Sequence, residues 1–103
     1  MMLVVTGAVS SAPEDFARLR AACLAHVRRS RTEQGCLAHT VHVDCEDPYR
    51  LFFFERWESR LALDAHFAAP GTAEFMKAVR ELATSRDGPH VDEVLKASLE
   101  EGR

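Results

Sequence analysis

The segment that most constrains the fold is LFFFERW at residues 51–57. Successive side chains of a strand point to opposite faces, so a strand buried on one face alternates apolar and polar residues. Here the first four residues are all bulky and apolar, which means that both faces of the predicted strand need a cover. Glu55 follows them and shares a face with Phe53 and Trp57, so the contacts of a carboxylate on that apolar face need an explanation.

Apolar periodicity divides the rest of the chain into helices and strands. Phe16, Leu19, Cys23 and Val27 recur at helical spacing, and SAPE at residues 11–14 has the form of a capping box. The arginines of this helix, at positions 18, 20, 28 and 29, are expected to face water. The predicted order begins with a strand at 2–9 and a helix that ends near Gly35, followed by strands at 36–44 and 50–58. A second helix begins at Ser59, is interrupted at 69–71 and resumes at 72–83. A loop at 85–90 leads to a fourth strand at 91–98.

This βαββαβ order is typical of the ferredoxin-like α+β fold, in which a four-stranded antiparallel sheet carries its helices on one face. The chain of 103 residues is predicted to form one such domain, residues 1–103. The helices leave the other face of the sheet open, and burying one phenylalanine there is worth about 1.5–3 kcal/mol. We therefore predict a homodimer in which two sheets pack face to face. The residues expected at that interface are Met2, Val4, Phe52 and Phe54.

The turn CEDPY at residues 45–49 sets the pairing of the second and third strands. It places His39 opposite Glu55, on the face that also carries Trp57. The same register pairs Asp44 with Arg50, Val41 with Phe53 and Leu37 with Trp57. A slip of two residues would keep this face and bring His39 opposite Trp57 instead. If the face lies under the helices, His66 of the second helix is expected to point toward the same space.

Several features between residues 30 and 70 occur together in one known family. They are Glu33 and Gly35 before the second strand with Cys36-Leu37 at its start, an Asp-Pro turn, an E-x-W strand end at Glu55 and Trp57, and an A-x-x-x-H helix at Ala62 and His66. With this ordered set the chain resembles the antibiotic biosynthesis monooxygenase (ABM) domain family of the dimeric α+β barrel superfamily. The resemblance implies that fold, a dimer, and a small-molecule pocket between sheet and helices. Related proteins include cofactor-free oxygenases of anthrones and quinols, haem-degrading enzymes, and isomerases of small sugar-like signals.

The chain departs from the family pattern at positions that bear on the substrate. Position 39, commonly a tyrosine in the family, is His39, and the tyrosine and arginine of anthrone-oxidising members have no matching residues. Haem degraders carry an asparagine on the first strand and a histidine on the helix after the interruption. Residues 2–9 contain no asparagine and residues 72–83 no histidine, so haem degradation is disfavoured.

The face shared by His39 and Glu55 carries the ionisable groups that proton abstraction needs, because burial raises a carboxylate's pKa and an imidazole titrates near neutrality. We predict His66 as general base or anion stabiliser, with Glu55 and His39 as its polar partners. The predicted substrate-binding wall consists of Trp57, Phe53, Leu63 and Phe75. The leading hypothesis is a cofactor-independent monooxygenase that oxidises a small quinol-like or polyphenolic substrate with dioxygen.

Two alternatives to this function stay open, a proton-transfer isomerase of a small metabolite and a non-catalytic dimeric binding module. The candidate residues also have structural interpretations, in which His39 and Glu55 form a satisfied buried pair, Trp57 fills the core, and His66 bonds a backbone carbonyl. We expect His42 at the dimer interface. His26, His90 and Tyr49 are expected at the surface.

Composition limits the kinds of partner. The net charge is −3 without a basic cluster, which disfavours nucleic acid. The opening MMLVVTGAV is too short for a membrane span and lacks the basic start of a signal peptide, so we predict a cytoplasmic protein. Cys23, Cys36 and Cys45 form no C-x-x-C pair and are predicted to be free thiols, with no metal site and no cofactor.

Overall fold

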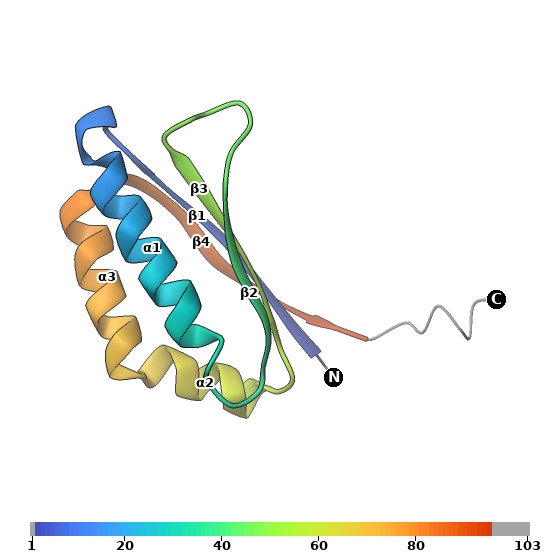
Figure 1. Cartoon of the computed structure of the whole chain (residues 1–103). Helices are drawn as coiled ribbons and strands as arrows, with labels where there is room; N and C mark the ends of the chain where they lie inside the picture. Colours follow the sequence, from blue (N-terminus) through green and yellow to red (C-terminus); the bar gives the residue numbers. More distant parts are fainter. Residues whose placement is uncertain (1, 96–103) are drawn as a thin grey trace.

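The computed structural model describes residues 2–95 and contains one antiparallel sheet with helices packed on one face (Figure 1). The strands are β1 (Met2–Ser11), β2 (Cys36–Val43), β3 (Arg50–Trp57) and β4 (Ala83–Val94), in the spatial order β2-β3-β1-β4. The helices are α1 (Phe16–Ser30), α2 (Arg60–Ala68) and α3 (Pro70–Leu82), with a short 3₁₀ turn at Pro13–Asp15 before α1. The predicted ferredoxin-like α+β fold is confirmed.

Alternate residues of β3 and β1 point under the helices and form the core. On β3, Leu51, Phe53 and Trp57 are buried, whereas Phe52 and Phe54 are only half-buried. The core has a larger and a smaller cluster. The larger consists of Val9, Leu19, Cys23, Val27, Leu51, Phe53, Val79 and Leu82, and the smaller of Leu3, Val5, Trp57 and Leu63. Glu55 lies on β3 between a residue of each cluster, so its carboxylate is buried where the two clusters meet.

The β2–β3 hairpin has the predicted register over most of its length. His39 lies opposite Glu55, and Val41 lies opposite Phe53. At the turn, Arg50 forms an ion pair of 2.8 Å with Asp44. The sheet therefore brings His39 and Glu55 onto the same helix-covered face, as the turn length predicts.

The prediction for Leu37 is wrong. A β-bulge between Cys36 and Ala38 brings Cys36 opposite Trp57, and Leu37 is 48% exposed instead of sharing the buried face. A bulge inserts one extra residue into one strand, so the pairing that precedes it shifts by one position. The turn length alone does not predict this shift.

Helix α1 begins and ends at other residues than predicted. No side chain caps its start, and the hydroxyl of Ser11 donates to the carbonyl of Ala12, so the capping-box prediction is wrong. The helix ends at Ser30, and Gly35 lies in the following turn with a φ of 85°, which favours glycine. A Cβ at Gly35 would overlap the Cβ of Ala62 on α2, so this glycine lets the turn pack closely against that helix.

Helix α2 begins as predicted. The hydroxyl of Ser59 accepts a hydrogen bond of 3.1 Å from the backbone N–H of Ala62. The break at Ala69 separates α2 from α3, which begins at Pro70, two residues before the predicted restart.

Strand β4 replaces the loop predicted at residues 85–90. The segment pairs with β1. Gly88 and Pro89, which favour a loop, lie where the pairing with β1 shifts register between Thr6 and Ala8, so the strand continues past them. Of the predicted fourth strand, residues 91–94 belong to β4, and residues 96–98 lie outside the described part of the chain.

The face of the sheet away from the helices carries Met2, Val4, Phe52 and Phe54, all half-buried within the single chain. The homodimer that would cover them stays a prediction. Within residues 2–95, the helices are all too short or too polar to cross a membrane.

Candidate functional site

A cavity of about 220 Å³ lies between the sheet and the helices. Its wall is mostly apolar, with Phe53 from β3 and Phe75 and Met76 from α3. Its polar side chains come from different elements and are Thr6, His26, Glu55, His66, Thr72 and, on β4, Arg86 and Asp87. An apolar cavity with a few converging polar groups is the usual form of a small-molecule site.

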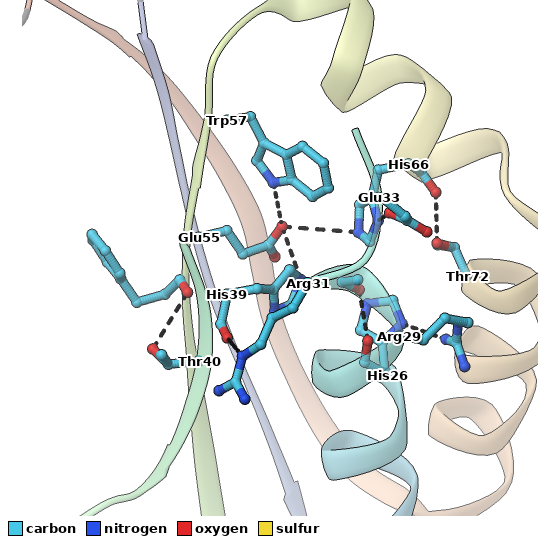
Figure 2. Close-up of polar contacts among 12 residues, drawn as sticks. His26, Arg29, Arg31, Glu33, His39, Thr40, Glu55, Trp57, His66 and Thr72 are labelled. Atoms are coloured by element: carbon cyan, nitrogen blue, oxygen red, sulfur yellow. Dashed lines mark hydrogen bonds and ion pairs between the residues drawn. The ribbon is translucent and has the colours of Figure 1, made fainter. Parts of the chain in front are cut away.

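Glu55 is the point where the buried polar contacts converge (Figure 2). Its Oε1 accepts a hydrogen bond of 2.9 Å from Nε1–H of Trp57, its neighbour on the same strand face. The same oxygen lies 3.2 Å from Nε2 of His39 and 3.9 Å from Nε2 of His66. A carboxylate that is only 7% exposed is thus surrounded by three ring nitrogens.

His66 is held on α2 by a second carboxylate. Its Nδ1 lies 2.6 Å from Oε1 of Glu33, in the turn between α1 and β2. Because a carboxylate only accepts, Nδ1 carries the hydrogen and Nε2 has the free lone pair. The hydroxyl of Thr72 donates to the His66 carbonyl at 2.6 Å and joins α2 to α3 at this point. His66 therefore has the arrangement of an oriented base.

His26, on α1, has the opposite arrangement. NH2 of Arg29 lies 2.8 Å from Nδ1 of His26 and also donates to the carbonyl of Gly71 at 2.7 Å. A guanidinium only donates, so Nδ1 accepts and Nε2 carries the hydrogen. Burial, together with the neighbouring His39, His66 and Arg29, lowers the pKa of His26 to about 3. The ring is thus a neutral N–H donor stacked on Phe75, with centroids 4.1 Å apart.

Gly71 makes room for this contact. A Cβ at that position would overlap the guanidinium of Arg29, so a larger residue would displace the arginine from His26. Arg29 approaches the backbone closely here because glycine has no side chain, and the start of α3 thereby contributes indirectly to the orientation of a histidine on α1.

His39, on β2, is almost completely buried, at 1% exposure. Neither of its ring nitrogens has a hydrogen-bond partner among the described residues, because the 3.2 Å approach to Glu55 lacks hydrogen-bond direction. Its ring packs edge-on against His26, His66 and Trp57, with centroids 5.3, 5.5 and 6.3 Å away.

The structure places the predicted site residues in two layers. Glu55, His66, Phe53 and Phe75 line the cavity. His39 contacts Glu55 beside it, and Trp57 and Leu63 are fully buried in the smaller core cluster and do not line it. The catalytic and substrate-binding roles of all seven stay predictions.

Sequence reasoning missed His26, Arg29 and Glu33. The surface positions predicted for His26 and Arg29 are wrong, since His26 is 4% exposed and Arg29 reaches across to Gly71. The signal for His26 is its spacing of three residues from Cys23, on the buried stripe of α1. Glu33 enters the sequence predictions only as part of the family motif before the second strand. The surface positions of His90 and Tyr49 are confirmed, and the place of His42 at a dimer interface stays a prediction.

A family model described as antibiotic biosynthesis monooxygenase matches residues 2–78, which contain His26, Glu33, His39, Glu55 and His66. Among curated proteins, "Putative monooxygenase Rv0793" of Mycobacterium tuberculosis is 35% identical over 72 residues, covering 70% of this chain and 70% of that protein. "Uncharacterized protein sll1783" of Synechocystis is 32% identical over 75 residues. That match covers 73% of this chain and about half, 51%, of the Synechocystis protein.

Solved structures share the whole fold. The structure of Rv0793 superposes with a TM-score of 0.86 at 28% identity, covering 95% of this chain and 99% of that one. A Deinococcus radiodurans structure, described as a "putative antibiotic biosynthesis monooxygenase", has a TM-score of 0.87 at 27% identity, with 95% and 96% coverage.

Proposed function

Because the chain belongs to the antibiotic biosynthesis monooxygenase family, we propose that it is a cofactor-independent monooxygenase of a small quinol-like or polyphenolic substrate. The observation that carries this proposal is the pair formed by His66 and His26 at the apolar cavity. Nε2 of His66 has a free lone pair, whereas Nε2 of His26 carries a hydrogen. One ring accepts a proton and the other donates a hydrogen bond, as deprotonation of a phenol or activated C–H requires.

His66 is the proposed general base. Its Nε2 takes the substrate proton, and the resulting imidazolium is stabilised by Glu33 at Nδ1, 2.6 Å away, and by Glu55, 3.9 Å from Nε2. A carboxylate behind an imidazole holds the ring in the useful tautomer and stabilises its charged form. Glu55 is held in turn by Trp57.

His26 is the proposed donor to the substrate oxyanion. Arg29 holds its hydrogen on Nε2, and the low pKa of His26 keeps the ring neutral at physiological pH. An N–H donor fixed in advance in a water-poor site stabilises developing negative charge. A flat aromatic anion would lie between Phe53 and Phe75.

The substrate anion itself is the proposed electron donor to dioxygen. For a hydroquinone with a free ring C–H position, oxidation to a hydroxyquinone supplies four electrons, two as the two phenol groups become quinone carbonyls and two as the ring C–H becomes C–OH. One oxygen atom of dioxygen enters the new C–O bond, and the other leaves as water with two of the hydrogens. The protein binds the anion, orients it and excludes water.

Oxygen consumption with a panel of hydroquinones and flat phenols tests the proposal. We expect His66→Gln to lower the rate about 10²–10⁴-fold, the usual contribution of a general base, and Glu33→Gln to lower it by less. His90→Gln is the matched control, because His90 is exposed and lies outside the cavity lining. Equal rates for wild type and His66→Gln across the panel would contradict the assignment.

The same pair of histidines also favours the alternative of proton-transfer isomerisation, which needs a base and an N–H donor but no oxygen. Turnover that continues under anaerobic conditions would support the isomerase. Thermal stabilisation by a ligand without any product by mass spectrometry would support a binding module.

The proposal includes a homodimer, formed by the open faces of two sheets, and a cytoplasmic location. The half-buried Phe52 and Phe54 support the dimer, because they would form a large apolar patch on a single chain. Dioxygen and a small aromatic molecule are the proposed partners at the cavity.

A further inference from the structure

We propose that His26, His39 and His66 form a binding site for a divalent transition-metal ion of the zinc type. This inference goes beyond the proposed oxygenation and does not depend on it. The three histidines come from α1, β2 and α2, and they meet only in the folded chain (Figure 2).

The geometry of the three rings is close to that of a metal site. One ligand nitrogen from each lies within 4.8 Å of the other two, and all three side chains are buried. Around a tetrahedral zinc ion with Zn–N distances of about 2.0–2.1 Å, neighbouring ligand nitrogens lie about 3.4 Å apart. Side-chain rotations that move the nitrogens by about an ångström would therefore close the site around an ion.

His39 supplies an independent observation. Both of its nitrogens are buried and lack a hydrogen-bond partner among residues 2–95. A buried polar group without a partner is costly and rare, and an unseen ion is one of its recognised explanations. The one polar contact reported for these nitrogens is the approach of Nε2 to Glu55 Oε1 at 3.2 Å, which lacks hydrogen-bond direction, and ligation to an ion would satisfy one of the two nitrogens.

The surrounding carboxylates also fit a cation. Glu33 binds Nδ1 of His66, which is the arrangement that orients metal-ligating histidines and leaves Nε2 for the ion. Glu55 Oε1, 3.2 Å from His39 and 3.9 Å from His66, is placed to supply a fourth ligand. The two carboxylates together offset the charge of a divalent ion, and the cavity provides its entry path.

Arg29 opposes the ion. For Nε2 of His26 to bind a metal, its hydrogen must move to Nδ1, and Arg29 must release Nδ1 while keeping its bond to Gly71. Because Arg29 must give up this contact, removal of its donor groups should tighten metal binding.

Ion binding and the proposed proton transfer use the same Nε2 of His66, so they exclude each other.

Titration of chelator-treated protein with Co²⁺ tests the site, because the visible spectrum of cobalt reports its ligands, and competition with Zn²⁺ gives the affinity of zinc. We expect one saturable site per chain. His39→Gln and His66→Gln should each weaken binding at least tenfold, and Arg29→Met should tighten it. His42→Gln and His90→Gln, both exposed, are the controls and should bind as wild type does.

Circular dichroism and thermal unfolding of each variant separate loss of the site from loss of the fold. If His39→Gln does not fold, His66→Gln and Arg29→Met carry the test. The proposal is overturned if folded wild type shows no saturable binding or if folded His66→Gln binds as wild type does. Loss of binding in the His42 or His90 variant would also overturn it, because the ion would then lie on the surface.

Discussion

At the scale of single residues, the site depends on which nitrogen of each histidine is already engaged. Glu33 holds the hydrogen of His66 on Nδ1, whereas Arg29 holds that of His26 on Nε2. Two chemically identical rings therefore present a lone pair and an N–H. His39 has neither kind of partner, so its nitrogens are not assigned to the acid–base pair, whereas His26 and His66 belong both to that pair and to the proposed metal site.

The thiols allow a prediction at the same scale. Burial raises the pKa of Cys23 to about 12, so about one thiol in ten thousand is ionised at pH 8. Burial also raises the pKa of Cys36, whereas Cys45 is exposed. We expect a thiol reagent such as Ellman's reagent to modify Cys45 fast, Cys36 slowly and Cys23 only after unfolding. Three equally fast thiols in the native protein would contradict this.

At the scale of elements, the turn between α1 and β2 holds the site together. It carries Glu33, and it packs against α2 close enough to reach His66. The backbone N–H of Glu58 donates to the carbonyl of Gly35, so the turn is also tied to the end of β3. The sequence motif with an acidic residue and a glycine before the second strand thus has a physical reason.

Gly35→Ala tests this element. The positive φ and the overlap of the new Cβ with Ala62 should lower the free energy of unfolding by about 1–2 kcal/mol or more, measured by denaturant titration. Activity should fall together with stability, because Glu33 would move from His66. Gln34→Ala, at the exposed neighbouring position, is the control and should change stability little. If Gly35→Ala were as stable as wild type, the positive φ and the contact with Ala62 would not require a glycine at this position.

At the scale of the whole molecule, the sheet has one covered and one open face. The helices cover one face of the sheet (Figure 1). The site lies beneath them, and the other face carries the half-buried Phe52 and Phe54. Because two of these side chains belong to β3, the strand that also carries Glu55, a dimer over this face would support the site from behind. The assembly is thus expected to affect both stability and activity.

We expect wild type to be a dimer at micromolar concentration and Phe54→Glu to be a monomer, because a carboxylate would be buried without a partner. Sedimentation equilibrium measures both. Leu61→Glu is the control, since Leu61 is 81% exposed on α2, away from this face. A monomeric wild type would contradict the homodimer.

Local sequence patterns are enough to predict the features that depend on near neighbours. The five residues of the hairpin turn set the pairing of His39 with Glu55, and the period-two pattern of β3 placed both under the helices. The wrong prediction of a loop at residues 85–90 also has a local cause. A glycine and a proline in β4 favoured a loop, and they fit a strand only because β1 has a compensating irregularity opposite them.

The helix side chains that complete the site are selected by long-range packing. The orientation of His26 depends on Arg29, and Arg29 depends on the room left by Gly71, 42 residues later. Glu33 and His66, 33 residues apart, meet because the turn packs against α2. Such contacts are absent from any local pattern, since a polar residue on a helix is satisfied equally by water or by a distant partner. The packing of the elements makes that choice.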